Sequence, residues 1–165
     1  MDVGRFYGGI AALIWAPQED KYLLLRRSDD KDYAAGVWEC VTGRVDQGEG
    51  FEDALKREVW EELGVDVEIE FILGTTHFYR GAEQTDNELI GVVCCCSLES
   101  PGTIRTSAEH SEHRWLSAQQ AYDLLTNQDP STRWIRRVIE RAEVMKEIVP
   151  PQLRDFYRQN GFELG

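Results

Sequence analysis

Two runs of apolar residues near the start of the chain flank a short polar segment. The runs cover Ile10–Ala16 and Tyr22–Leu25, and Gln18–Lys21 lies between them. Short apolar runs that are bounded by turn-forming residues indicate strands. This part of the chain therefore predicts a β-hairpin, which is followed by a charged loop over Ser28–Gly36 and a short strand over Val37–Thr42.

The middle of the chain passes from a glycine-rich segment to a helical and then to a strand periodicity. Gly43–Gly50 contains three glycines and predicts a loop. Apolar residues recur at helical spacing over Phe51–Leu63, and Gly64 follows at the position that commonly ends a helix. Val65–Leu73 alternates apolar with mostly acidic residues and predicts a strand. Leu89–Leu98 is almost continuously apolar, which favours a strand that is buried on both faces.

The last third of the chain predicts a short strand and then helices. The strand covers His113–Leu116, and a helix capped by a serine follows over Ser117–Leu125. A longer helix over Ser131–Ile148 ends before a pair of prolines, and Gln152–Asn160 predicts a last short helix. Because strands and helices are interleaved in 165 residues, the fold class is α/β or α+β in a single domain.

Net charge and hydropathy exclude several classes of protein. The chain has 18 Lys and Arg against 30 Asp and Glu, a formal charge of −12, so its surface repels a polyanion and long nucleic acid is not an expected partner. The apolar stretch Gly8–Ala16 is far shorter than the roughly 18 residues that span a bilayer. The residues Pro17–Asp20 behind it do not suit a signal-peptide cleavage site, so we expect a cytoplasmic protein.

The four cysteines do not form a redox or zinc motif. Cys40 stands alone and Cys94–Cys96 are adjacent, so neighbouring thiols point to opposite faces of a strand. No Cys-x-x-Cys spacing is present. We expect small apolar strand residues.

Three glutamates of the helix over Phe51–Leu63 lie on one face. Glu58, Glu61 and Glu62 are spaced i, i+3 and i+4 near the end of the helix, where the dipole is negative. Crowding them there costs on the order of 1–2 kcal/mol, which folding alone does not explain. A bound Mg²⁺ would explain it, and a solvated acidic face paired with Arg57 or Lys56 is the alternative. The apolar stripe beside this face consists of Phe51, Leu55, Val59 and Leu63.

The whole segment 43–65 matches a longer pattern. The pattern is a glycine, five residues, a glutamate, seven residues and then Arg-Glu-hydrophobic-x-Glu-Glu-x-Gly-hydrophobic. The matching residues are Gly43, Glu49, Arg57, Glu58, Val59, Glu61, Glu62, Gly64 and Val65. This is the Nudix box without a departure, so the chain resembles MutT-like members of the Nudix hydrolase family. The order of the other predicted elements extends the resemblance over Gly8–Glu143.

The resemblance implies an α/β/α sandwich with a mixed β-sheet, as a single domain over residues 1–165. It implies hydrolysis of a nucleoside diphosphate that is linked to another group. Residues 150–165 are a C-terminal extension, for which a lid and a contact in a homodimer both stay open. Within the box, which covers 43–65, Gly43 and Gly64 would shape the backbone, and Arg57 would pair with Glu49 to hold the loop against the helix.

The same resemblance assigns the chemistry to glutamates. Glu58, Glu61 and Glu62 would bind Mg²⁺ or Mn²⁺, and the carbonyl of Thr42 would add a ligand. Many relatives have Pro-Gly before the box glycine where this chain has Val-Thr, and threonine suits that position only if φ is negative. The string Trp38–Gly43 resembles a subgroup that acts on nucleoside or pterin triphosphates.

The resemblance also provides candidates for the general base and for the substrate contacts. Glu109 matches a glutamate that binds metal or acts as base in some members, Glu58 is a second candidate for the base, and Glu112 competes with Glu109. Arg27 matches a phosphate-contacting arginine, and a solvated strand end is the alternative. Core packing is favoured over base stacking for three aromatic residues, namely Trp38, Phe78 and Tyr79.

Three functions are therefore compared. The first is a pyrophosphohydrolase of a nucleoside triphosphate or related small nucleotide. The second is a hydrolase of nucleotide sugars, dinucleoside polyphosphates or capped RNA, the negative charge arguing against long RNA. The third is a non-catalytic regulator that binds nucleotides, although such modules usually lack a box glutamate and this chain lacks none. An isoprenoid diphosphate isomerase shares the fold, but only Cys40 lies near the box and no histidine ligands can be placed.

Overall fold

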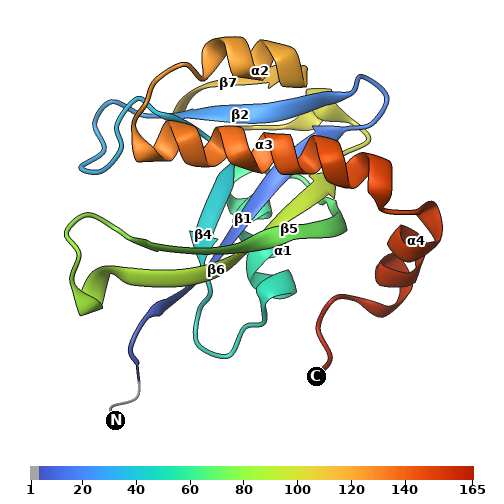
Figure 1. Cartoon of the computed structure of the whole chain (residues 1–165), viewed down its shortest axis with the longest axis horizontal. Helices are drawn as coiled ribbons and strands as arrows, with labels where there is room; N and C mark the ends of the chain where they lie inside the picture. The colour runs from blue at the N-terminus through green and yellow to red at the C-terminus, as the bar shows by residue number, and fades with distance from the viewer. Residues whose placement is uncertain (1–3) are drawn as a thin grey trace.

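A mixed β-sheet of seven strands forms the centre of the molecule (Figure 1). The computed structural model describes residues 4–165, so the first three residues of the predicted domain lie outside it. The strands are β1 (Tyr7–Ala16), β2 (Lys21–Arg27), β3 (Trp38–Glu39), β4 (Val41–Arg44), β5 (Glu68–Tyr79), β6 (Glu88–Ser97) and β7 (His110–Leu116). The α-helices are α1 (Phe51–Leu63), α2 (Ala118–Leu124), α3 (Pro130–Ile148) and α4 (Pro151–Asn160). Over residues 4–165, every helix is too short or too polar to span a bilayer.

The sheet is ordered β3-β2-β1-β6-β5, with β4 also paired to β1 and β7 also paired to β2. The predicted hairpin is confirmed: β1 and β2 pair antiparallel around a turn in which Asp20 has a φ of 50°. β1 and β6 run parallel, so the chain must cross over between them, and α1 lies on that crossover.

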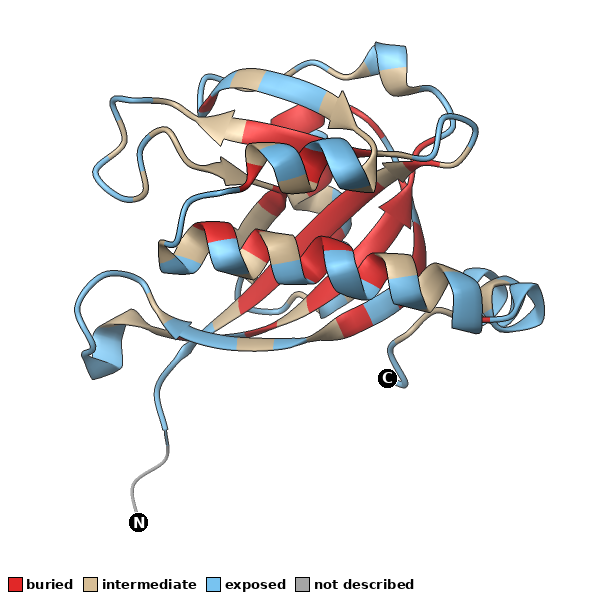
Figure 2. Cartoon of the chain, turned by 45° about the horizontal axis from the view of Figure 1, so that its top comes forward, coloured by how far each residue is buried: buried red, intermediate tan, exposed pale blue. Residues whose placement is uncertain are grey.

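Helices cover both faces of the sheet, as the expected α/β/α sandwich requires (Figure 1). Alternate residues of β1 show the two layers, because Ile10, Ala12 and Ile14 join the apolar cluster under α1. Ala11 and Leu13 instead join the cluster under α2 and α3. Burial is concentrated on the central strands and on the helix faces that meet them (Figure 2). A strand packed on both faces reads as a continuous apolar run, which is what the sequence of β1 shows.

Several element boundaries differ from the sequence predictions; for example, β1 starts at Tyr7 and β7 at His110, each three residues before the predicted start. The segment 37–42 is two strands and not one, because the chain changes partner at Cys40: β3 pairs with β2, and β4 pairs with β1. β4 continues through Arg44, so the predicted loop is shortened to residues 45–50. β5 starts at Glu68 and runs to Tyr79, since its long ladder with β6 extends well beyond the alternating stretch.

Two burial predictions also need correction. Phe51 is 42% exposed, and the buried face of α1 consists of Ala54, Leu55, Val59, Glu62 and Leu63. β6 is buried on both faces only over residues 93–97, while Ile90 in its first half is exposed. The four cysteines are buried free thiols, as expected of apolar strand residues. Burial in the apolar sheet raises the pKa of the Cys40 thiol.

Candidate active site

The backbone around the box is shaped by its glycines. Gly64 ends α1 in the left-handed conformation, with φ at 66°, and its N–H donates to the Trp60 carbonyl at 2.8 Å. Gly43 lies beside α1, where a Cβ would overlap the carboxylate of Glu58. Within residues 4–165, the non-glycine residues with positive φ are Asp20 and Ala34, so Thr42 fits its place in β4 without strain. The Val-Thr departure from the family pattern therefore leaves the backbone in the ordinary extended form.

Arg57 connects the loop before α1 to the glutamates of the helix. Its Nε and Nη2 donate to the two carboxylate oxygens of Glu49 at 2.7 and 2.9 Å. Its Nη1 lies 2.9 Å from Glu58 Oε1 and 3.3 Å from Glu61 Oε2, and Nη2 also donates to the Arg44 carbonyl at 2.9 Å. The hydrogen bonds from Arg57 lower the pKa of Glu49 to about 2. The expected Arg57–Glu49 pair is thus present and bidentate, the strong geometry for these two groups.

Glu62 is a buried carboxylate in acidic surroundings. Its Oε2 is buried and lacks a hydrogen-bond partner within the described part of the chain. Burial, together with the charges of Glu39, Glu109 and Glu58, raises the pKa of Glu62 to about 9. A proton or a bound cation at this position would relieve both the desolvation and the repulsion.

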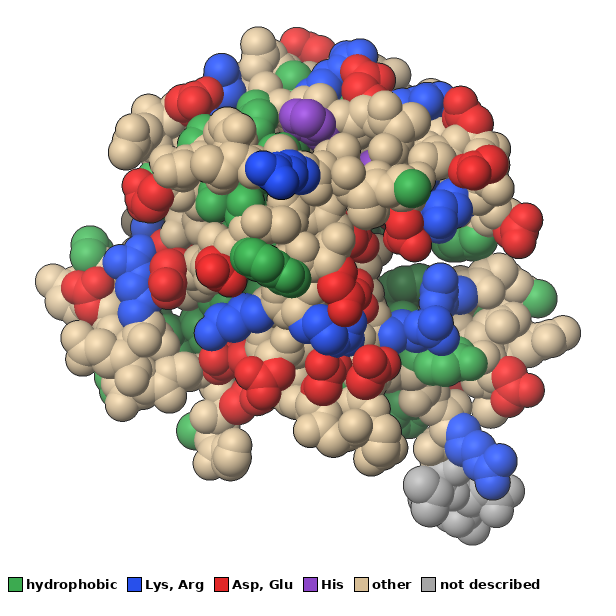
Figure 3. Space-filling model, turned by 180° about the vertical axis from the view of Figure 1, so that it is seen from behind, with side chains coloured by type: hydrophobic (Ala, Val, Ile, Leu, Met, Phe, Trp, Pro, Cys, Tyr) green, Lys and Arg blue, Asp and Glu red, His purple; other side chains and the backbone are tan. Residues whose placement is uncertain are grey.

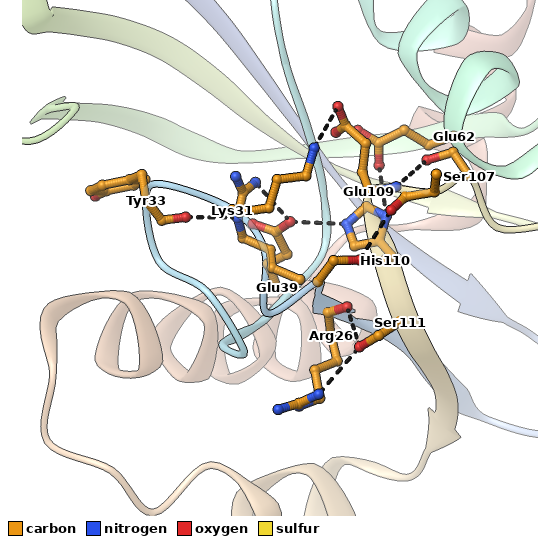
Figure 4. Close-up of polar contacts among 12 residues, drawn as sticks. Arg26, Lys31, Tyr33, Glu39, Glu62, Ser107, Glu109, His110 and Ser111 are labelled. Atoms are coloured by element: carbon orange, nitrogen blue, oxygen red, sulfur yellow. Dashed lines mark hydrogen bonds and ion pairs between the residues drawn. The ribbon is translucent and has the colours of Figure 1, made fainter.

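His110, the first residue of β7, lies between two of these carboxylates (Figure 4). Its side chain is 1% exposed, with Nε2 2.9 Å from Glu39 Oε1 and Nδ1 3.9 Å from Glu62 Oε2. Glu39 Oε1 is also 3.4 Å from Arg27 Nη1, so the predicted Arg27 reaches the site in contact with Glu39. Sequence reasoning missed Glu39 and His110. The signals for them were indirect: His110 adjoins the candidate Glu109, and Glu39 lies within the string Trp38–Gly43.

The structure separates Glu109 from Glu112. Glu109 lies in the turn before β7, and its Oε1 is 3.4 Å from Lys31 Nζ (Figure 4). Glu112 instead pairs with Arg114, at 2.6 Å, outside the cavity described next. Of the two loop candidates, only Glu109 therefore faces the box glutamates.

A cavity of about 740 Å³ brings the predicted residues together. Thr42, Gly43, Glu58, Glu62 and Glu109 line it, while Glu61 lies outside it with its side chain 56% exposed. Its cationic lining consists of Arg27, Lys31, Arg44 and Arg80, and its aromatic lining of Tyr33, Trp38, Phe78, Tyr79 and Trp134. Acidic and basic side chains alternate on the face of the molecule that carries α1 (Figure 3).

Two aromatic residues depart from the packing prediction. Phe78 and Tyr79 line the cavity and belong to neither apolar cluster, because they lie on the part of β5 that extends beyond the core. Trp38 both packs against the cluster under α3 and lines the cavity, as does Trp134. The cavity therefore has aromatic walls near its carboxylates.

The carboxylates suit a hard cation, although they are not gathered into a cage. Within residues 4–165, no group of three His, Cys, Asp or Glu side chains is close enough to hold a metal ion. Glu58 and Glu61 are both turned toward Arg57, and Glu62 is turned toward His110. Oxygen donors and the unpartnered Glu62 Oε2 are appropriate for Mg²⁺ or Mn²⁺. Binding by all three glutamates requires Glu58 and Glu61 to move away from Arg57.

Comparison with known proteins agrees with this fold. The model of the NUDIX domain family matches residues 7–141. The chain therefore belongs to the Nudix hydrolase family.

Individual relatives cover different shares of the chain. A dihydroneopterin triphosphate diphosphatase of Escherichia coli strain K12 is 41% identical over 126 residues, covering 68% of this chain and 79% of its own. A MutT-like protein of Streptomyces ambofaciens is 31% identical over 103 residues, covering 62% of this chain; the chain spans only 59% of that relative. The crystal structure of a MutT protein from Methanosarcina mazei Go1 superposes with a TM-score of 0.70 at 26% identity, covering 89% and 99% of the two chains.

Proposed function

We propose that the chain is a divalent-metal-dependent pyrophosphohydrolase of a nucleoside triphosphate or of a related triphosphate with a fused heteroaromatic ring. The observation that carries the proposal is the single cavity in which box carboxylates, cations and aromatic rings meet. Carboxylates with a metal suit the reacting phosphate, cations suit the other phosphates, and rings suit a base or a pterin. The E. coli relative named for dihydroneopterin triphosphate, at 41% identity, supports the same substrate class.

In this proposal Glu58, Glu61 and Glu62 hold Mg²⁺ or Mn²⁺, with the carbonyl of Thr42 nearby. A metal ion bound there would neutralise charge on the phosphate oxygens and lower the pKa of a bound water. Arg57 keeps two of the three carboxylates close together before the metal binds. His110 Nδ1 lies 3.9 Å from Glu62 Oε2, beyond hydrogen-bond distance.

We assign the role of general base to Glu109. Its Oε1 lies 3.4 Å from Lys31 Nζ. A substrate phosphate would compete for Lys31 and free a Glu109 oxygen to accept the proton of the attacking water. Water then attacks phosphorus, the anhydride bond breaks, and pyrophosphate leaves with the bridging oxygen.

The test is a substrate panel with two separate product assays. Nucleoside triphosphates, dihydroneopterin triphosphate, nucleotide sugars and dinucleoside polyphosphates are incubated with Mg²⁺ or Mn²⁺, and pyrophosphate and phosphate are measured separately. We expect a triphosphate to give its monophosphate and pyrophosphate, and excess chelator to abolish the reaction. If a nucleotide sugar or a dinucleoside polyphosphate is the preferred substrate, the proposed triphosphate class is wrong. Tight nucleotide binding without turnover would identify a non-catalytic regulator.

A further inference from the structure

The helix that carries the box glutamates has no cap of its own. Its N-cap residue is Gly50, which offers no side chain, so the first free N–H groups of α1 need another acceptor. The Phe51 N–H donates to the carboxylate of Glu163, a residue 112 positions further along the chain. Because the family match ends at residue 141, this acceptor comes from outside the matched region.

The contact between the tail and α1 is reciprocal. Glu52, in the first turn of α1, accepts hydrogen bonds from the N–H groups of Phe162 and Glu163, the latter at 3.0 Å. Two glycines make room for it: a Cβ at Gly50 would overlap the Glu163 carboxylate, and Gly161 adopts a φ of 75° facing Glu52. Each partner thus satisfies backbone donors of the other, as the two residues of a capping box do within one helix.

Two further contacts hold the chain end in this position. The Tyr157 and Phe162 rings stack with centroids 4.2 Å apart, and Phe162 packs against the apolar cluster under α1. Arg158 on α4 pairs at 2.5 Å with Glu70, a buried residue of β5. The tail accordingly runs back from α4 toward the middle of the molecule and does not project from it (Figure 1).

The cap adjoins the segment that positions the metal-binding carboxylates. Glu49 directly precedes Gly50 and holds Arg57, whose other nitrogen contacts Glu58 and Glu61. The loop between β4 and α1 contains Gly48 at a φ of 92°, and Glu49 anchors it: the Glu49 N–H donates to the Asp46 carbonyl at 3.1 Å, and Glu49 Oε2 accepts from the Asp46 N–H at 3.0 Å. A frayed first turn of α1 would displace Glu49 together with its hold on Arg57.

We propose that Glu163 is a positioning residue, and that the C-terminal tail caps α1 and so places Glu49, Arg57 and the box glutamates. A carboxylate suits this position because the N-terminus of a helix carries partial positive charge. The kinetic part of the proposal rests on the proposed function, while the capping itself does not.

The experiment compares Glu163→Ala, Glu163→Gln and the parent. For each, kcat, KM, the half-saturating Mg²⁺ concentration and Tm are measured, together with hydrogen exchange over residues 45–57. The matched control is Ser117→Ala, which removes the side-chain cap of α2, a helix that does not line the cavity. The full chain is used throughout.

For Glu163→Ala we expect several-fold faster exchange over residues 45–57, a several-fold higher half-saturating Mg²⁺ concentration and a lower kcat with nearly unchanged KM. Glu163→Gln, which keeps an acceptor without the charge, recovers part of each effect. Ser117→Ala lowers Tm but leaves the Mg²⁺ response and the exchange of this segment unchanged. Unchanged exchange in Glu163→Ala overturns the cap, and an Mg²⁺ response like that of Ser117→Ala overturns the positioning role. If the parent hydrolyses no triphosphate, the proposed function fails, and exchange together with Mg²⁺ binding by calorimetry still decides the cap and the positioning.

Discussion

Glu62 is the side chain whose environment says most about the site. One of its oxygens has no partner among the described residues, and burial, together with three acidic side chains, raises its pKa to about 9. A folding protein gains nothing from a carboxylate in that position, because both desolvation and repulsion act against it. A cation that binds there supplies the missing interaction.

We expect Glu62→Gln to lose most of the activity and to keep the fold. The amide resembles the neutral carboxyl that burial already favours, so the free energy of unfolding should change by less than about 1 kcal/mol or increase. Turnover should fall by about 100-fold or more, since a charged metal contact is lost. The measurements are kcat at saturating Mg²⁺ and Tm in chelator. Full activity in the variant would refute the metal role.

Variants of Glu58 and Glu109 separate metal binding from proton transfer. Glu109→Gln should lower kcat strongly with little change in Mg²⁺ affinity, because its turn contributes no box ligand. Glu58→Gln should lower both kcat and the affinity for Mg²⁺, since Glu58 lies on α1 with the other glutamates. Kinetics and calorimetry with Mg²⁺ give the two quantities. Glu112→Gln is the control, because Glu112 pairs with Arg114 outside the cavity. If Glu109→Gln turns over within a few-fold of the parent, Glu58 becomes the next candidate for the base.

Among the elements, α1 depends most on contacts from outside itself. Its last turn carries no basic residue, and its first turn is capped from the chain end. Arg57 compensates on one side by holding Glu49, Glu58 and Glu61 together. The unfavourable crowding of glutamates is thus offset by one guanidinium and a bidentate partner.

Arg57→Ala should therefore lower both stability and turnover, and its effect on stability should depend on pH. Glu49 has a pKa of about 2 in the folded protein against 4.5 ordinarily. The unfolded chain binds the extra proton between these values, so the stability from this pair is complete above pH 4.5 and is lost as the pH falls toward 2. The difference in Tm between parent and Arg57→Ala should shrink across that window. Lys56→Ala, at an exposed neighbouring position, should show no such trend.

At the scale of the whole molecule, a polar contact on the α3 side of the sheet joins β2, near the start of the chain, to α3, near its end. The hydroxyl of buried Tyr22 on β2 donates to Glu143 Oε1 on α3 at 2.6 Å. Lys146 then bridges Glu143 and Asp20, at 2.7 and 2.6 Å. Burial raises the pKa of Tyr22, so the hydroxyl stays protonated and remains a donor.

Tyr22→Phe should destabilise the chain by about 1–2 kcal/mol, since a hydrogen bond to a charged acceptor is lost without a change in packing. The activity of the variant should be unchanged at denaturant concentrations that leave it folded, because Tyr22 does not line the cavity. Urea unfolding compares it with Tyr7→Phe, whose ring is exposed and which should change stability by less than about 0.5 kcal/mol. Equal midpoints for the two variants would mean that the contact contributes nothing to stability.

The local periodicity of the sequence was sufficient to predict many of the helices and strands. The hairpin, the limits of α1 and the serine cap of α2 follow from spacing along one element. A helix or strand period relates residues a few positions apart, so neighbours within an element can be read directly. The box pattern likewise indicated the Arg57–Glu49 pair.

The other features of the fold and the site depended on contacts between segments that are far apart in the sequence. The spacing of residues within one helix or strand carries no information about such contacts. Only the fold separates Glu109, which faces the cavity, from Glu112, three residues later, which pairs outside it. Only the fold brings His110 between Glu39 and Glu62, extends β5 so that Phe78 reaches the cavity, and returns Glu163 to the start of α1. Most elements were determined by the sequence near each residue, whereas the division of residues 38–44 into two strands, the length of β5 and the surroundings of the site were decided by which distant strands and chain ends pack together.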